Sequence, residues 1–161
     1  MSNIQPDSNF TLLKSVKDLT ETEQLLITKA KEAAMNAYAP YSEFYVGAAL
    51  ELRSGEILVG NNQENAAYPS GLCAERVLLF STGANYPSKQ IKTLAVLAYK
   101  NDKVVAATPC GACRQVMVEY EQKQENPIKI IMYKGEDDII VSNDAKGLLP
   151  FAFDSKSLLN K

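Results

Sequence analysis

The chain has three cysteines and no histidine, and all three cysteines lie in two short motifs. Glu75 follows Cys73 by two residues, and residues 109–113 (PCGAC) contain Cys110 and Cys113. A Cys-x-x-Cys pair at the start of a helix places two thiolates within reach of one metal ion, and a third cysteine leaves a tetrahedral zinc one protein ligand short. We therefore expect one Zn²⁺ per chain, held by Cys73, Cys110 and Cys113.

Glu75 is the candidate catalytic residue. It should lie in the first turn of a helix, where its carboxylate can reach the space above the metal without being a ligand. Water is a poor nucleophile at neutral pH, and zinc lowers the pKa of a coordinated water to roughly 7 in favourable sites. A carboxylate beside that water can carry all the proton transfers of a hydrolytic reaction.

Arg76 is expected to balance the charge of the site. Three thiolates more than neutralise Zn²⁺ and leave the unit at about −1. The helix N-termini near Cys73 and Cys110 each supply roughly half a positive charge. Arg76 follows Cys73 by three residues and so shares its helix face. These positive charges would offset the excess negative charge of the thiolates.

The same residues allow three other interpretations. A Cys-x-x-Cys pair can be a redox pair. A glutamate in the first turn of a helix is often a surface residue favoured by the helix dipole. A closed structural zinc site would need a fourth ligand, which an Asp or Glu could supply. The combination of both motifs with Pro109 favours the catalytic interpretation.

Length and composition indicate one globular domain. The chain has 161 residues, of which 46% are apolar, and its 19 acidic residues outnumber 17 basic ones. This balance offers no electrostatic footprint for nucleic acid or for an anionic membrane. Without an apolar run of 18 residues or a signal-peptide pattern, a cytoplasmic protein is expected. Cysteines at metal-like spacing agree with a reducing compartment.

Sequence patterns also predict the elements that position these residues. Thr20 and Glu23 form a capping-box pattern at the start of a helix, and Pro40 would end that helix. A four-residue link is too short for a parallel crossover, so the last two strands must be antiparallel. The expected elements are helices over residues 21–38, 73–83 and from 110 onward, strands over 44–52, 56–60, 93–99, 104–107, 129–133 and 138–142, and a short closing helix from 143 or 144.

The two ends of the chain leave alternatives open. Residues 1–19 are expected to form an N-terminal arm, in which residues 10–13 are either an added strand or a segment lying on a neighbouring subunit. Residues 148–153 are unusually apolar for a chain end and need cover. Contact with another subunit and packing onto the same domain both provide it.

A polar segment, residues 61–69, follows the predicted hairpin. In extended chain Asn62 and Glu64 point to the same side. An amide beside a carboxylate can hold a pair of sugar hydroxyls. On composition alone, a solvated loop is the alternative.

Several blocks in order resemble those of cytidine deaminases, specifically the small homotetrameric kind with three cysteine ligands. A Cys followed two residues later by Glu, and then Pro-Cys-x-x-Cys, is similar to the signature of zinc-dependent nucleobase deaminases. The resemblance runs from about Tyr38 to Phe153. Its blocks are Ala39-Pro40-Tyr41-Ser42, Val46-Gly47-Ala48-Ala49-Leu50, Glu64-Asn65-Ala66, Tyr68-Pro69, Cys73-Ala74-Glu75-Arg76, Pro109-Cys110-Gly111-Ala112-Cys113-Arg114-Gln115 and Leu148-Leu149-Pro150.

The resemblance implies an α/β fold, a three-layer α/β/α domain over residues 20–161. Its five-stranded mixed sheet would end in two antiparallel strands. The implied activity is zinc-dependent hydrolytic deamination of cytidine and 2′-deoxycytidine to uridine and 2′-deoxyuridine, with release of ammonia, in pyrimidine salvage. The preference between the two nucleosides is left open. The family also implies a homotetramer whose active sites are shared between subunits.

The resemblance further implies roles for individual residues by position. The zinc ligands match the three cysteines, and the proton shuttle matches Glu75. Asn62 and Glu64 match residues that hold the ribose. The remaining matches are Phe44 as a ring against the pyrimidine, Ala74 as a backbone contact to the base, Arg76 as the partner of the cysteine ligands, and Tyr68 and Phe153 as residues lent by neighbouring subunits.

The chain also departs from the family pattern. Tyr45 stands where a small residue is usual, and Glu43 stands where many members have a basic or polar residue; both lie at the expected edge of the pocket. The alternatives are a deaminase of another cytosine nucleoside, of the blasticidin type, and a non-catalytic zinc or redox domain. The first would not be expected to keep Asn62, Glu64 and Tyr68 in this arrangement.

Overall fold

A computed structural model of the chain describes residues 10–135, 138–155 and 158. Residues 1–9 of the expected N-terminal arm, and the middle of the link between the last two strands, therefore lie outside the described residues. Among the described residues, no helix combines the length and the apolar character that a membrane span requires.

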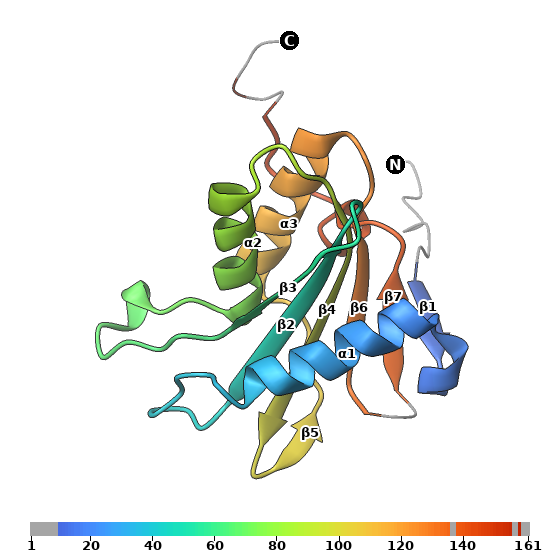
Figure 1. The fold of residues 1–161 in the computed structure, drawn as a ribbon. Helices are drawn as coiled ribbons and strands as arrows, with labels where there is room; N and C mark the ends of the chain where they lie inside the picture. The colour runs from blue at the N-terminus through green and yellow to red at the C-terminus, as the bar shows by residue number, and fades with distance from the viewer. Residues whose placement is uncertain (1–9, 136–137, 156–157, 159–161) are drawn as a thin grey trace, which may run out of the picture.

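In the described part of the chain, seven strands form one mixed sheet (Figure 1). Their order is β1-β7-β6-β4-β2-β3, and β5 pairs with β4 beside this path. Strands β4 and β6 are parallel, and the other pairs are antiparallel. The strands are β1 (Phe10–Leu13), β2 (Tyr45–Leu52), β3 (Ile57–Asn61), β4 (Ile91–Lys100), β5 (Lys103–Val105), β6 (Lys129–Tyr133) and β7 (Ile139–Ser142).

Helices cover both faces of the sheet (Figure 1). Helix α1 lies on one face, and α2 and α3 lie side by side on the other. The three-layer α/β/α arrangement expected from the sequence is confirmed. The helices are α1 (Glu21–Ala34), α2 (Ala74–Asn85) and α3 (Gly111–Gln124), with 3-10 turns η1 (Val16–Asp18), η2 (Tyr68–Ser70) and η3 (Lys146–Leu148).

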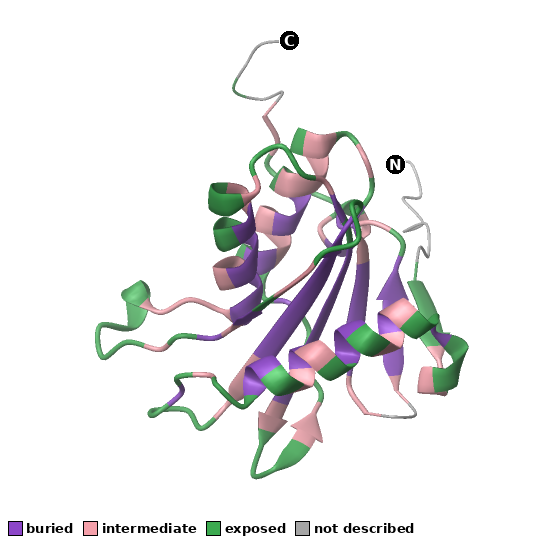
Figure 2. Ribbon diagram, viewed as in Figure 1, coloured by how far each residue is buried: buried purple, intermediate pink, exposed green. Residues whose placement is uncertain are grey.

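Two hydrophobic cores lie between these layers, because successive strand residues point to opposite faces. Alternate residues of β2, β4 and β6 therefore belong to different cores, and these central strands are buried over most of their length (Figure 2). The row Leu50, Leu94 and Ile130 faces α2 and α3, and the row Ala49, Ala95 and Ile131 faces α1.

Two glycines let the helices approach the β2–β3 hairpin at backbone distance. A Cβ atom at Gly47 would lie 1.9 Å from the carbonyl oxygen of Ala30 in α1. A Cβ atom at Gly60 would lie 2.8 Å from Cβ of Leu78 and 3.1 Å from the carbonyl oxygen of Ala74, both in α2. Real Cβ atoms do not approach this closely, so both positions require glycine unless a helix moves away.

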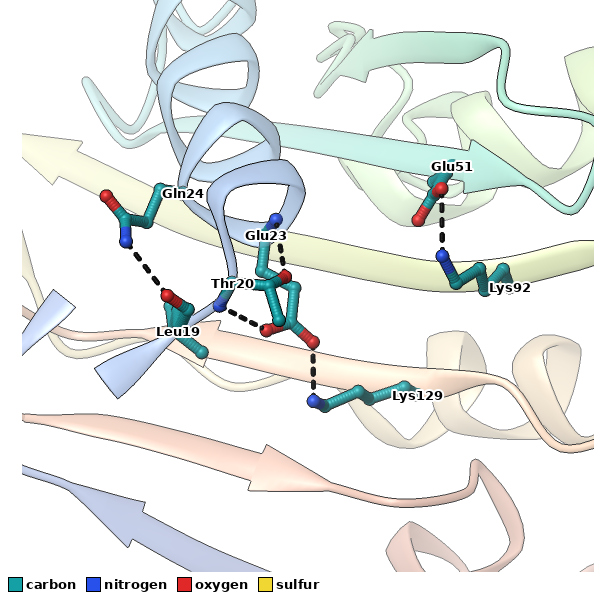
Figure 3. Close-up of polar contacts among 7 residues, drawn as sticks. All are labelled: Leu19, Thr20, Glu23, Gln24, Glu51, Lys92 and Lys129. Atoms are coloured by element: carbon teal, nitrogen blue, oxygen red, sulfur yellow. Dashed lines mark hydrogen bonds and ion pairs between the residues drawn. The ribbon is translucent and has the colours of Figure 1, made fainter. Parts of the chain in front are cut away.

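The expected capping box begins α1 (Figure 3). The backbone N–H of Thr20 donates to the Glu23 carboxylate at 2.9 Å, and the N–H of Glu23 donates to the Thr20 hydroxyl at 3.3 Å. The second oxygen of Glu23 accepts from Lys129 at the start of β6. Figure 3 shows that this carboxylate therefore links the first turn of α1 to the sheet.

The structure corrects three details of the expected fold. The sheet has two strands beyond the five that the resemblance implies: residues 10–13 pair with β7, which is the added strand that the sequence left as one of two alternatives, and the strand expected over residues 104–107 is β5, which folds back on β4. Helix α1 ends at Ala34 rather than residue 38, since the backbone N–H of Tyr38 is bonded to the carbonyl of Asn62 instead. Helix α2 continues past Gly83 to Asn85. The antiparallel pairing of the last two strands is confirmed.

Candidate active site

Two helix N-termini bring the three cysteine sulfurs together. Cys73 is the N-cap of α2, and Cys110 is the N-cap of α3. The Sγ of Cys110 lies 3.9 Å from that of Cys73 and 3.5 Å from that of Cys113, and all three sulfurs lie within 4.8 Å of one another. These separations exceed a disulfide bond of about 2.05 Å. Arg114 donates from Nε to the Pro109 carbonyl at 2.7 Å and so closes the turn before α3.

The cluster suits a zinc ion with one open position. Tetrahedral zinc takes thiolate ligands at about 2.3 Å, which places ligand sulfurs just under 4 Å apart. The separations of 3.9 and 3.5 Å that Cys110 makes with the other two sulfurs are close to this value. Among the described residues, no fourth Cys, His, Asp or Glu joins the group, so the fourth position is available to a water or a substrate atom.

Arg76 supplies the positive charge that the thiolates need. One of its terminal nitrogens, Nη2, lies 3.8 Å from the Sγ of Cys73. A hydrogen bond from the Cys113 thiol, together with Arg76, lowers the pKa of Cys73 to about 5 despite burial. The Nε of Arg76 is buried and has no hydrogen-bond partner among the described residues. Such a donor fits beside a cluster of anionic sulfurs.

Glu75 lies in the first turn of α2 and is buried, with 4% of its surface exposed. Burial is the main cause that raises the pKa of its carboxyl group, and the neighbouring Cys73 raises the pKa further. A carboxyl group with a raised pKa can both take up and return a proton near neutral pH.

A cavity of about 640 Å³ opens above the cysteines. It is lined by polar and aromatic residues from the 41–46 segment, the 62–73 segment and the first turn of α2. Of the residues singled out from the sequence, the cavity brings together Phe44, Asn62, Glu64, Tyr68, Cys73, Glu75, Arg76 and Cys110.

Asn62 holds the backbone at the entrance to β2. Its Oδ1 accepts from the N–H of Val46 at 2.7 Å, and its Nδ2 donates to the carbonyl of Phe44 at 2.9 Å. An amide nitrogen carries two hydrogens, so one remains after this bond. The side chain therefore positions Phe44 as well as facing the cavity.

Glu64 holds the 41–42 turn in a similar way. One carboxylate oxygen accepts from the N–H groups of Tyr41 and Ser42 at 2.9 and 3.3 Å, and the other accepts from the hydroxyl of Ser42. The hydrogen bond from the Ser42 hydroxyl is the main cause that lowers the pKa of Glu64. The group is therefore a carboxylate at neutral pH.

Four of the sequence candidates lie elsewhere or at the edge of this cavity. Cys113 is fully buried, so its sulfur belongs to the cysteine cluster but does not line the cavity. Ala74 is fully buried and does not line it. Tyr68 lines it but is 76% exposed, with its ring edge-on to Tyr41 at a centroid distance of 6.1 Å. Phe153 is 59% exposed and does not line the cavity of its own chain.

Sequence reasoning gave no role to several residues of the site. The Ser42 hydroxyl binds Glu64 and also accepts from the N–H of Phe44 at 3.0 Å, so it connects two sides of the cavity. Val96, Ala107 and Thr108 complete the wall. A signal for Ser42 was present in the block Ala39-Pro40-Tyr41-Ser42, but its partner Glu64 is distant in sequence.

The sequence of the chain is similar to those of known cytidine deaminases. Residues 20–126 match the family model described as the cytidine and deoxycytidylate deaminase zinc-binding region. The chain is 42% identical over 133 residues to the cytidine deaminase of Sporosarcina psychrophila, which covers 83% of this chain and 92% of the relative. It is 33% identical to the probable cytidine deaminase of Dictyostelium discoideum, with 84% and 86% covered.

Solved structures are similar as well. The cytidine deaminase from Burkholderia pseudomallei matches with a TM-score of 0.69 at 39% identity, and the match covers 84% of this chain and all of that one. The cytidine deaminase from Mycobacterium tuberculosis matches with a TM-score of 0.63 at 32% identity, covering 84% and 99%. The resemblance inferred from the sequence motifs is confirmed by both kinds of comparison.

Proposed function

The chain belongs to the cytidine and deoxycytidylate deaminase family, and we propose from this membership that it deaminates cytidine and 2′-deoxycytidine to uridine and 2′-deoxyuridine. It is a hydrolytic enzyme that releases ammonia and binds one zinc ion, and it would act in pyrimidine salvage. The observation that carries the proposal is the position of buried Glu75 beside three sulfurs that leave a fourth ligand position open.

Cys73, Cys110 and Cys113 would hold the metal. When bound, zinc supplies an acidified water, which is the nucleophile the reaction needs. The water oxygen bonds to C4 of the pyrimidine, and the bond from C4 to the amino nitrogen breaks. Glu75 would take one proton from the water and give it to ring atom N3. It would then take the second proton from the new C4 hydroxyl and give it to the amino group, which leaves as ammonia while the C4–O bond becomes the carbonyl of the product. The buried carboxyl group is suited to these exchanges because its pKa is raised.

We assign the nucleoside contacts to other side chains that line the same cavity as Glu75. Asn62 and Glu64 would hold the ribose hydroxyls, and the ring of Phe44 would lie against the pyrimidine. Their common place in the cavity wall supports this assignment. Ala74 would contribute only its backbone, which agrees with its buried side chain. Tyr45 and Glu43 would affect the edge of the pocket and not its chemistry.

We propose a homotetramer with active sites shared between subunits. Two exposed aromatic rings support this: Phe153 does not line the cavity of its own chain, and Tyr68 lines it but is 76% exposed. A second copy would give Phe153 the cover that an apolar ring requires.

Two further assignments are proposals of the same kind. Residues 20–161 would form the deaminase domain, and residues 1–19 an added arm, since the family match begins at residue 20. The protein would work in the cytoplasm, because three thiols must stay reduced to hold the metal.

The replacement Glu75→Gln tests the proposal. The variant should retain about one zinc per chain and lose turnover of cytidine by roughly 10²- to 10⁴-fold, because the proton transfers are lost. Zinc is measured by atomic absorption and turnover by the ultraviolet change on deamination. A wild-type chain without stoichiometric zinc would indicate a redox pair, and one with zinc but no turnover would indicate a structural site.

Mixing two inactive variants tests the shared site. A Phe153→Ala chain has an intact zinc site but lacks the ring it would lend, and a Glu75→Gln chain has the reverse defect. Hybrid tetramers should regain activity that neither variant has alone. Hybrids that form, as seen by native mass spectrometry, and stay inactive would exclude sharing through Phe153.

A further inference from the structure

One side chain of α3 binds both backbone polar groups of Phe153. The Nε2 of Gln115 donates to the Phe153 carbonyl at 2.7 Å, and the Phe153 N–H donates to Oε1 of Gln115 at 3.3 Å. The side-chain amide of Gln115 therefore forms the same pair of hydrogen bonds with Phe153 that a residue of a neighbouring β-strand would form. We call residues 149–155 the tail. Residues 149–155 have no helix or strand of their own, so this pairing holds a segment that lacks regular structure.

Gln115 follows the cysteine Cys113 by two residues on the same helix. A second side chain of that helix binds residues shortly before the tail. The Glu121 carboxylate accepts from the N–H groups of Ala145 and Lys146 at 2.7 and 3.2 Å. Helix α3 therefore carries part of the metal site at its N-terminus and also anchors the C-terminal segment at two points.

We propose that Gln115 is a positioning residue for the active site of a neighbouring subunit. It fixes the backbone of Phe153, whose ring is 59% exposed and does not line the cavity of its own chain. This inference rests on the proposed sharing of active sites. The role needs a glutamine, because only an amide offers a donor and an acceptor to the two backbone groups at once.

The variant Gln115→Ala should lower kcat/KM for cytidine about tenfold, since two hydrogen bonds that order the tail are lost. Zinc content and thermal stability of the tetramer should not change, because the mutation replaces a half-buried side chain outside the core. Gln115→Glu keeps the acceptor for the Phe153 N–H but places a second acceptor oxygen against the Phe153 carbonyl, where two acceptors repel, so it should not restore activity. The matched control is Gln122→Ala, the same replacement two turns along α3, where Oε1 has no hydrogen-bond partner among the described residues.

Hybrid tetramers separate action on the neighbour from action within the chain. In a mixture with excess Glu75→Gln chains, each intact zinc site of a Gln115→Ala chain receives a normal tail. Activity per Gln115→Ala chain should then rise about tenfold, back to the wild-type value. An unchanged low activity would mean that Gln115 acts on its own chain, and an undiminished homotetramer would mean that it has no role in positioning; either result overturns the proposal.

The mixture of Phe153→Ala with Glu75→Gln chains, run in parallel, shows whether a negative result concerns Gln115 alone or the shared active site. Recovery there but not with Gln115→Ala overturns the role of Gln115 and leaves the shared site standing. Recovery in neither mixture, with hybrids shown to form, overturns both. Turnover by the wild-type protein reports on the deaminase assignment itself and does not depend on either result.

Discussion

Replacement of Arg76 by glutamine should weaken zinc binding without unfolding the domain. The guanidinium nitrogen Nη2 lies 3.8 Å from the Sγ of Cys73, and the side chain is only partly buried. Zinc with three thiolates carries a charge of about −1, which Arg76 brings close to neutrality. Glutamine is shorter than arginine and uncharged, so this change removes the positive charge together with the contact to sulfur, and the lysine variant described below, which keeps the charge, separates the two.

The expected loss follows from this distance. Two unit charges 3.8 Å apart attract by about 4 kcal/mol at an effective dielectric constant of about 20. Water around a partly exposed guanidinium reduces this value, and we take about 2 kcal/mol as the remaining contribution. That corresponds to roughly a thirtyfold lower zinc affinity. Arg76→Lys keeps the charge but not the planar fork, so its affinity should lie between those of the wild type and the glutamine variant.

Competition with a chromogenic zinc chelator measures the affinity directly. The stabilisation of the fold by excess zinc provides an independent measure, since it grows with the logarithm of zinc concentration over Kd. It should be lower by about 2 kcal/mol in the glutamine variant. An affinity within twofold of the wild type would refute the electrostatic reasoning. A lysine variant as weak as the glutamine variant would show that the shape of the guanidinium matters and its charge does not.

The remaining predictions concern recognition and stability. Glu64→Ala should lower kcat/KM for cytidine roughly ten- to a hundredfold and should lower kcat/KM for free cytosine less. Ser42→Ala, which keeps the Glu64 carboxylate, should lower kcat/KM for both compounds equally. Equal losses on both compounds for Glu64→Ala would argue against a ribose contact. Thr20→Ala should cost about 1 kcal/mol in urea unfolding, because a helix cap is lost, and a neutral effect would contradict the capping box. Burial acts to raise the pKa of Glu23, but hydrogen bonds from Lys129 and Thr20 lower it overall below 4.5. The contribution of the Glu23 carboxylate to the free energy of unfolding is therefore present above that pH and lost as pH falls through the lowered pKa. The stability difference between wild type and Glu23→Gln should then shrink in acid. A difference that stays constant with pH would exclude this contribution.

Local chemistry explains which parts of the fold could be predicted. Thr20 and Glu23 are three residues apart, so their reciprocal bonds depend on one helical turn alone, and the structure contains them. The short link after Tyr133 similarly leaves only an antiparallel return. Strand β1 pairs Phe10 with Ser142, across most of the chain. No local pattern distinguishes that pairing from an arm lying on another subunit.

The active site also has parts that the sequence predicts and parts that it does not. The type and spacing of the cysteines limit the chemistry before any fold is known, and the structure brings all three within 4.8 Å. The partners of the polar side chains could not be predicted, because they lie on segments distant in sequence. Glu64 binds Ser42 and Gln115 binds Phe153 across 22 and 38 residues. Hydrogen-bonding capacity is readable from a residue type, but the choice of partner depends on packing.

The contact of Gly60 with the first turn of α2 limits how the substrate range of this enzyme can change. A methyl group on Gly60 would lie 3.1 Å from the carbonyl oxygen of Ala74, which is a close contact. Ala74 lies between Cys73 and Glu75 in the chain. A larger residue in β3 would shift ligand and proton carrier together relative to Asn62. Substitutions that accommodate a bulkier sugar or base are therefore to be sought in the 41–44 turn, where a side chain can change size while the reacting atoms keep their spacing.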